Sequence, residues 1–376
     1  MTREPIDRIA AEAGGVLTID LGAIAANYRE LARRAAPARC AAVVKADAYG
    51  TGIEQTARAL AQTGCDTFFV ALLGEARALR AVLPAATIYV LNGLHPHTAA
   101  AFREIGAAPV LGSFPEIEEW DAFSRTAGVR LSAAIHVDTG MRRHGILPAD
   151  AAALAKGLAR LHFRPSLVMS HMACADEPEH PMNARQIADF RAIAARFPGI
   201  PASLANSPAL LALPDARFDL VRPGISLYGG RALLRGDNPM RPVVRLDLRI
   251  LQVREAKSGE TVGYGATQTL ARDSRIAVVA AGYADGIPRT AGSSDRMRGA
   301  EAVVHGKRCP ILGRVSMDLI SLDITDLPLG AVKRGDFATL LGEGITVDDL
   351  AEPAGTVGYE ILTRLGRRCH RVYVGG

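Results

Sequence analysis

A lysine directly follows an apolar run in the stretch "CAAVVKADAYGTG", at a point where its ammonium group would lose water. Desolvation lowers the pKa of such a lysine, so Lys45 is suited to act as a nucleophile and to form a Schiff base with a carbonyl compound. Tyr49 lies four residues further on, and Gly50 and Gly52 allow the backbone to turn closely around a ligand. Taken alone, Lys45 also fits an ordinary ion pair at the end of a strand.

Two later segments combine groups that suit a phosphate. Arg222 ends an apolar run in "LVRPGISLYGG", and Gly224 and Ile225 follow where a turn or helix is expected to begin. Backbone N–H groups that are free at such a point bind phosphate well. Ser207 ends another run, in "LANSP", and offers a hydroxyl group. A Schiff-base lysine together with a phosphate site predicts pyridoxal 5'-phosphate as the cofactor.

These residues belong to short apolar runs that alternate with helical stretches. After "VLTIDL" eight more runs follow, at residues 41–45, 67–72, 87–92, 108–112, 132–138, 166–171, 202–207 and 218–224. Strand then helix, repeated eight times, predicts an α/β fold, a (β/α)8 barrel of the TIM type, over residues 12–235. Its strands would end at one mouth and bring Lys45, His171 and Arg222 together. A doubly wound sheet is the alternative, but the count of eight and the lack of an early G-x-G-x-x-G favour the barrel.

The pattern changes after Pro- and Gly-rich residues near 230–242. Residues 236–376 read as strand after strand with tight turns, which predicts a second, mostly β domain. Residues 1–11 could pack on this second domain. A short helical stretch, "GYEILTRLGRR", lies near its end.

Composition narrows the classes of function. The chain has 376 residues, a net charge of +5 and only 5% aromatic residues, without a basic run that would favour nucleic-acid binding. Five widely spaced cysteines and no C-x-x-C predict neither a disulfide framework nor a metal site, and they fit a reducing cytoplasm. No segment is apolar over the length of a membrane span, so no membrane partner is expected.

Nine stretches of the chain, in order, resemble the bacterial alanine racemases. They are "VVKADAYGTG", "HVDTGMRRHGI", "SHMACADE", "ANSPA", "VRPGISLYG", "VGYGAT", "GYADGIPR", "GRVSMD" and "GTVGYEILTRL". The resemblance implies a homodimeric enzyme that interconverts L- and D-alanine with pyridoxal 5'-phosphate, with each active site shared across the dimer interface. It does not distinguish D-alanine biosynthesis from L-alanine breakdown.

The resemblance also implies a role for each matching residue. Lys45 would carry the cofactor and be one catalytic base, and Tyr264 of the second subunit would be the other. Arg222 would contact the pyridine nitrogen, and His171 would link Arg222 to Tyr264. Arg143 would bind the substrate carboxylate, helped by the backbone of Met317 from the partner subunit. The phosphate would be held by Tyr49, Ser207, Gly224, Ile225 and Tyr359. The access path would be lined by Asp176, Tyr283, Arg289 and Arg314.

A two-base arrangement also follows from the chemistry. Racemisation removes a proton from one face of Cα and returns one to the other face. Lysine and tyrosine both have pKa values near 10, so each must be lowered to act at neutral pH. Arginine keeps its charge and has no proton to give away, so Arg222 would bind the ring nitrogen without protonating it.

The chain departs from the family pattern at four places. His136 stands where a lysine, often carbamylated, braces the substrate-binding arginine, so the bracing of Arg143 is open. Thr51 and Asp47 replace the usual His and Asn, and Ser203 lies where a His is common.

Three alternative functions stay open beside the racemase. They are a decarboxylase with the same two-domain plan, a pyridoxal phosphate carrier without activity, and a barrel that binds sugar phosphates.

Overall fold

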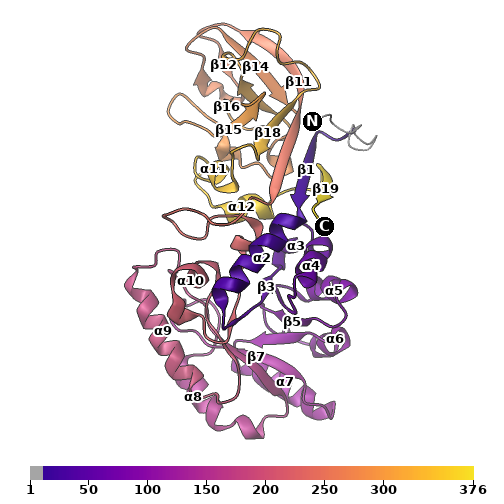
Figure 1. Cartoon of the computed structure of the whole chain (residues 1–376), viewed down its shortest axis with the longest axis vertical. Coiled ribbons are helices and arrows are strands. Elements are labelled where there is room, and N and C mark those ends of the chain that lie inside the picture. Colours follow the sequence, from indigo (N-terminus) through magenta and orange to yellow (C-terminus); the bar gives the residue numbers. More distant parts are fainter. Residues whose placement is uncertain (1–11) are drawn as a thin grey trace. The chain divides into compact units, whose positions relative to one another are not determined.

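The computed structural model describes residues 12–376 and divides into two compact units (Figure 1). One unit is Ile24–Arg241. The other combines the described residues up to Ala23 with Pro242–Gly376. The expected packing of residues 1–11 on the second domain lies outside the described residues.

The first unit contains the predicted parallel barrel. Its strands are β2 (Arg39–Cys40) with β3 (Ala42–Val43), β4 (Thr67–Val70), β5 (Thr87–Val90), β6 (Ala108–Leu111), β7 (Ser132–His136), β8 (Arg164–Met169), β9 (Ala202–Ser203) and β10 (Leu220–Val221). From β3 to β9 each strand pairs in parallel with the next. The last strand closes the ring, because β10 pairs with β2 and the Arg222 N–H donates to the Ala205 carbonyl on the other side. The α/β barrel prediction is therefore confirmed.

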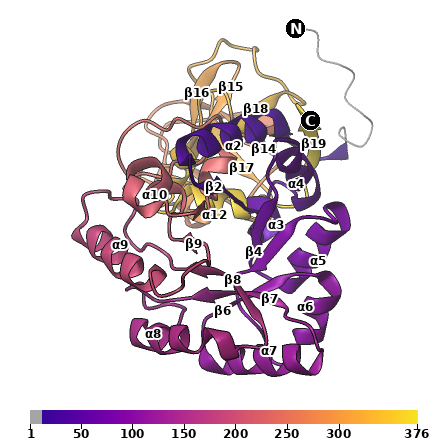
Figure 2. The same ribbon diagram turned by 60° about the horizontal axis from the view of Figure 1, so that its bottom comes forward.

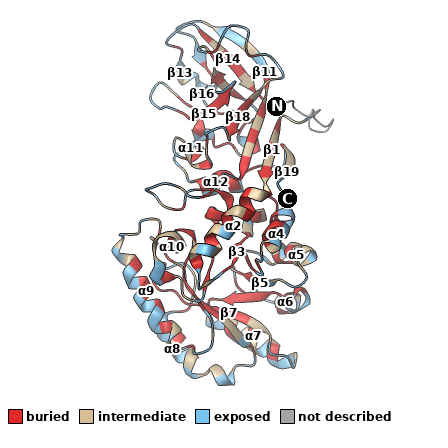
Figure 3. Ribbon diagram, viewed as in Figure 1, coloured by how far each residue is buried: buried red, intermediate tan, exposed pale blue. Residues whose placement is uncertain are grey.

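Helices surround these strands on the outside (Figure 2). They are α2 (Leu21–Ala35), α4 (Ile53–Gln62), α5 (Leu73–Val82), α6 (Ala99–Ile105), α7 (Phe114–Thr126), α8 (Pro148–Lys156), α9 (Pro181–Ala194) and α10 (Ser207–Ala212), with short 3-10 turns η1 (Leu158–Arg160), η2 (Pro214–Ala216) and η3 (Ile225–Tyr228). Each longer helix is two-faced, because only its apolar side packs on the strands. In α9, for example, Ile187, Phe190 and Ile193 are buried while the outward positions are exposed (Figure 3).

The first predicted strand belongs to the other unit. Strand β1 (Gly15–Asp20) pairs antiparallel with β11 (Val244–Ala256) and parallel with β19 (His370–Val374). Its burial alternates residue by residue, as in a sheet with one covered face, whereas all four residues of β4 are buried. The compact unit that contains the barrel strands spans Ile24–Arg241, and the sequence prediction for this domain was residues 12–235.

The second unit is the expected mostly β domain. Its large sheet has the order β14-β17-β16-β15-β18-β11-β1-β19, and β14 also pairs with β11, which closes six strands into a ring. The remaining elements are β12 (Thr261–Val262), η4 (Tyr264–Ala266), β13 (Gln268–Thr269), β14 (Ser274–Val279), η5 (Tyr283–Asp285), η6 (Arg289–Ala291), β15 (Glu301–Val304), β16 (Lys307–Leu312), β17 (Ile320–Asp323), β18 (Phe337–Leu341), α11 (Val347–Ala351) and α12 (Gly358–Thr363). Val262, Leu270, Ile276 and Leu312 form a small cluster of buried apolar side chains in this unit.

Among the described helices, none combines the length and the apolar character needed to cross a bilayer. In residues 12–376, no group of three or more His, Cys, Asp or Glu side chains is placed to hold a metal ion.

Candidate active site

Lys45 begins a turn of unusual hand at the end of β3. The turn, α3 (Lys45–Tyr49), has a left-handed backbone, with φ of 53° to 54° at the four residues from Ala46 to Tyr49. Gly50 and Gly52 continue it at φ of 78° and 93°, as expected for a close turn. The Asp47 carboxylate accepts the Ile53 N–H at 2.8 Å and so ties the turn to the start of α4. Asp47 thus has a structural role of its own.

The surroundings of Lys45 change its basicity. Burial lowers the pKa of Lys45 below its ordinary value, and the nearby guanidinium of Arg143 lowers it further, while the carboxylate of Glu75 acts in the opposite direction. The sequence predicted the desolvated lysine. It did not predict the arginine beside it or the opposing carboxylate, which lies 30 residues along the chain on α5.

Arg222 is a buried cation, only 4% exposed. Its Nη2 donates to the Ser170 carbonyl at 2.6 Å and to the Leu204 carbonyl at 3.4 Å, and its Nη1 donates to the Ser203 hydroxyl. Within residues 12–376 these neutral oxygens are its hydrogen-bond acceptors. Burial lowers the pKa of Arg222 to about 9, so the side chain is still cationic at neutral pH. Ser203 therefore fills the place of the missing histidine as a neutral acceptor.

A buried polar network stands behind this arginine. The Gln186 amide nitrogen donates to the His171 carbonyl at 3.0 Å and to the Thr139 hydroxyl at 3.1 Å. The Thr139 and Ser170 hydroxyls are hydrogen-bonded at 2.8 Å, and the Ser170 carbonyl accepts from Arg222. Sequence reasoning missed Gln186, which lies inside α9. The sequence feature that could have indicated this role is a glutamine on the apolar face of a helix. A glutamine in such a position is buried only when its amide oxygen and its amide nitrogen both have hydrogen-bond partners.

The two histidines near the arginines are neutral. Burial lowers the pKa of His136 to about 3, and the cations Arg222 and Arg143 add to this effect. Burial, followed by the same two arginines, also lowers the pKa of His171 well below its usual value. The His136 ring lies 5.2 Å from that of His144. The barrel mouth thus collects positive charge and keeps the imidazoles of His136 and His171 uncharged.

Arg143 is presented on a loop held by Asp138. The Asp138 carboxylate accepts the backbone N–H groups of Gly140 at 2.8 Å and Arg142 at 3.1 Å. In the described part of the chain, Arg143 itself forms no hydrogen bond or ion pair. His136 carries no charge at neutral pH, so it does not replace the anionic brace of the family pattern.

Four of the five residues predicted to hold phosphate, Tyr49, Ser207, Gly224 and Ile225, belong to the barrel unit and come together around Gly224. The Ser207 hydroxyl accepts the N–H of Gly224 at 2.8 Å and that of Ser226 at 3.4 Å. A side chain at Gly224 would collide with the Tyr49 hydroxyl, since its Cβ would lie 2.3 Å from Oη. The hydroxyl of the fully buried Ser226 has no partner in the described residues. The donor set of hydroxyls and backbone N–H groups suits a phosphate.

Apart from Asp176, which belongs to the barrel unit, the remaining predicted residues lie in the second unit. Tyr264 is 69% exposed, in a turn between Gly263 and Gly265, both at φ of 77°. Met317 is exposed, and its carbonyl accepts the Ala284 N–H, next to Tyr283. Tyr359 lies on α12. Tyr283 and Arg289 line a cavity of about 480 Å³ with Arg364.

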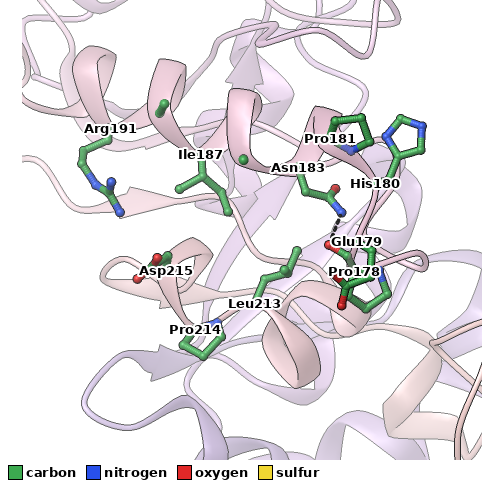
Figure 4. Close-up of a pocket in the computed structure, with 12 residues that line it drawn as sticks. Pro178, Glu179, His180, Pro181, Asn183, Ile187, Arg191, Leu213, Pro214 and Asp215 are labelled. Carbon is green, nitrogen blue, oxygen red and sulfur yellow. Dashed lines mark hydrogen bonds between the residues drawn. The ribbon is translucent and has the colours of Figure 1, made fainter.

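A further cavity of the barrel unit lies away from these residues. It measures about 510 Å³ and is bordered by α9 and by the η2 turn (Figure 4). Ile187, Arg191, Leu213 and Asp215 are among its lining residues, and none of the predicted site residues is. The predicted site residues of the barrel unit lie instead after strands β3, β7, β8, β9 and β10.

Fold and site together define a class of enzyme: a parallel barrel with a desolvated lysine and a group of hydroxyls and backbone N–H groups at its strand ends, joined to a mostly antiparallel β unit. Comparison with known proteins names the family. Residues 19–232 match the N-terminal domain of alanine racemase, and residues 243–373 match its C-terminal domain. The chain belongs to the alanine racemase family and is an enzyme of the racemase class.

Individual relatives agree over nearly the full length. The alanine racemase of Methylobacterium sp. (strain 4-46) is 55% identical over 361 residues, which cover 96% of this chain and 98% of that protein. The alanine racemase of Bartonella henselae, solved with covalently bound pyridoxal phosphate, is 38% identical, with a TM-score of 0.90 over 96% of this chain and all of that one. The biosynthetic alanine racemase of Pseudomonas aeruginosa is 37% identical, with a TM-score of 0.89 over 96% of this chain and 99% of that one.

Proposed function

We propose that the protein interconverts L- and D-alanine with pyridoxal 5'-phosphate held at the barrel mouth. The observation that carries this proposal is the desolvated Lys45, whose pKa is lowered, in the same mouth as the buried cation Arg222. When bound, the cofactor makes the Cα proton of an amino acid acidic. Lys45 would hold it covalently, and the phosphate would be held by Tyr49, Ser207, Gly224, Ile225 and Tyr359.

Two bases on opposite faces of the substrate account for racemisation. Lys45 Nζ would exchange the proton on one face of Cα, and Tyr264 Oη would exchange it on the other. The lowered pKa of Lys45 favours the neutral amine that this role requires. Arg143 would bind the substrate carboxylate, assisted by the Met317 backbone. His171 is uncharged and close to Arg222. It would form hydrogen bonds to both Arg222 and Tyr264 and so link them.

Arg222 would set the electronic character of the cofactor ring. Its pKa of about 9 leaves it cationic at neutral pH, and a guanidinium only donates hydrogen bonds. It would donate to the ring nitrogen and keep that nitrogen unprotonated, which limits how strongly the ring withdraws electrons. Such restraint favours reprotonation at Cα over side reactions.

The second base would come from another copy of the chain. Tyr264 is 69% exposed and sits on a glycine-flanked turn, so it is available to a partner. A homodimer would place the tyrosine of one subunit in the site of the other. The five cysteines are free thiols, in keeping with a reducing cytoplasm as the place of action.

The test is direct. The purified protein should be yellow, the colour should be lost on borohydride reduction, and L-alanine should yield D-alanine. The mass of the borohydride-treated protein should show one pyridoxyl group, located on Lys45 by peptide mapping. Carbon dioxide release in place of D-alanine would support the decarboxylase alternative, and a colourless protein would support the sugar-phosphate barrel.

A further inference from the structure

The left-handed turn after Lys45 is energetically costly and must be held in place. For L-residues the left-handed helical conformation costs roughly 1–2 kcal/mol per residue, and four non-glycine residues in succession adopt it here. A strained backbone of this kind is stable only where several contacts with the surrounding structure hold it in place. Both ends of the turn matter, since Lys45 precedes it and Tyr49 ends it.

One carboxylate anchors the start of this turn. Glu75 Oε1 accepts the N–H of Ala46, the residue after Lys45, at 2.6 Å. Glu75 Oε2 accepts the N–H groups of Ala71 and Leu72 at 2.8 and 3.1 Å. Ala71 and Leu72 follow strand β4, which is the neighbour of β3. A single side chain therefore fixes the Lys45 turn to the end of the next barrel strand.

The same device occurs once more in the barrel. Glu116 is the third residue of α7, as Glu75 is of α5. Its Oε1 accepts the Leu94 N–H at 2.9 Å, in the loop after β5, and its Oε2 accepts the Gly112 N–H at 3.0 Å, after β6. Both glutamates thus tie neighbouring strand ends together. The two glutamates differ in the segment that they bind. Glu75 binds the turn that follows Lys45, whereas the loop at Leu94 carries none of the predicted site residues.

Glu75 is also the carboxylate that opposes the cations around Lys45. Arg143 lowers the lysine pKa, His171 is a neutral neighbour, and Glu75 raises the pKa. We propose that Glu75 is a positioning residue, which holds the left-handed turn and thereby orients Lys45 and Tyr49 toward the cofactor. This inference rests on the proposed function for its catalytic consequence, but the effect on the lysine itself can be measured separately.

The test compares Glu75→Gln with Glu116→Gln in the full-length protein. Glutamine has one acceptor oxygen where glutamate has two. Each variant therefore loses the hydrogen bonds to the backbone N–H groups at one of the two strand ends. We expect Glu75→Gln to lower kcat for D-alanine formation and to weaken pyridoxal phosphate binding by about 10- to 100-fold each. Glu116→Gln should stay within about threefold of the parent in both, with a comparable fall in melting temperature.

A second readout isolates the lysine. After removal of the cofactor, the pH dependence of Lys45 acylation is followed by peptide mass mapping. Removing the negative charge in Glu75→Gln should shift the midpoint to lower pH, whereas Glu116→Gln should leave it unchanged. If Glu75→Gln does not fold, Glu75→Asp serves instead: it is too short to span both strand ends, so we expect the same weakening of cofactor binding.

The outcomes separate the two proposals. If the parent protein makes no D-alanine, the proposed function fails, and Lys45 acylation still tests the role of Glu75. If Glu75→Gln matches Glu116→Gln in cofactor affinity and in the acylation midpoint, Glu75 is only a structural cap and the inference is overturned.

Discussion

Lys45 and Tyr264, the two proposed bases, have opposite surroundings. Lys45 follows a buried strand, and its turn is fixed by hydrogen bonds to Glu75 and Asp47. Tyr264 stands 69% exposed on a short turn between two glycines with positive φ. The surroundings of Lys45 are thus formed by residues of its own unit. Tyr264, in contrast, is a large aromatic side chain that is mostly exposed to solvent.

The difference shows how each base would obtain its reactivity. Lys45 has its pKa lowered by the fold of its own unit, through burial and Arg143. Tyr264 is 69% exposed in its own unit, and its side chain would be enclosed only on binding to another chain. Changes at Lys45 should therefore act within one chain, and changes at Tyr264 should be complemented by another chain.

The largest expected effect is at Lys45. Lys45→Ala should reduce D-alanine formation by roughly 10⁴-fold or more, since it removes both the proposed covalent anchor and one of the two proposed bases. Racemisation is measured in both directions by chiral chromatography. Lys45→Ala activity within tenfold of the parent would refute the assignment.

Tyr264→Phe comes next, with a loss of about 10²- to 10⁴-fold. Because the side chain is exposed, the free energy of unfolding should change by no more than about 0.5 kcal/mol. Co-expression with Lys45→Ala sharpens the comparison. In a dimer with shared sites, mixed dimers contain one intact site, so activity should recover to about a quarter of the parent value. Sites built within one chain would show no recovery.

Acid should weaken the barrel unit through His136. Its pKa is about 3 in the folded protein, against about 6.5 in an unfolded chain. The unfolded chain binds more protons between these values, so the stabilisation is complete above pH 6.5 and is lost as the pH falls toward 3. From pH 7 to 5 the free energy of unfolding should drop by about 2 kcal/mol on account of His136. Denaturant titrations at several pH values measure this slope, and His136→Gln should flatten it.

The smallest effect is expected at the turn that carries Tyr264. Gly263 has φ of 77°, and an added Cβ would lie 3.3 Å from the Arg314 nitrogen. Gly263→Ala should cost about 1–2 kcal/mol in unfolding free energy. Thermal unfolding checks this value, with Gly259→Ala as a control at positive φ that has open space around the added methyl group. Activity should fall with Gly263→Ala only, since only this change displaces Tyr264.

Much of the barrel could be predicted from the sequence. The eight apolar runs from residue 41 to residue 224 correspond to the eight strand positions, because parallel strands buried on both faces are apolar throughout. Strand β1 was misplaced because a short apolar run does not say which sheet it joins. Its hydrogen bonds to β11 and β19 depend on residues more than 200 positions away.

Parts of the site could not be predicted in this way. The left-handed turn breaks the usual preference of alanine and aspartate, so local propensity predicts against it. Gln186 and Glu75 read as ordinary helix residues, and only their hydrogen bonds to distant backbone groups distinguish them. The neutral state of His136 follows from its burial near Arg222 and Arg143, and no sequence motif shows that these residues are close in space.

The sequence by itself determined the residue types and their order: a lysine and an arginine at the ends of apolar runs, a serine and glycines suited to phosphate, and a tyrosine in a glycine-rich turn. Chemistry depends on residue type, so these groups can be recognised from the order of amino acids alone. The tertiary structure decided which charges are buried together, which carboxylate holds the lysine turn, and which of the two proposed bases stays exposed. Desolvation and hydrogen bonding act between atoms that are close in space, and proximity across more than 200 residues exists only in the folded chain.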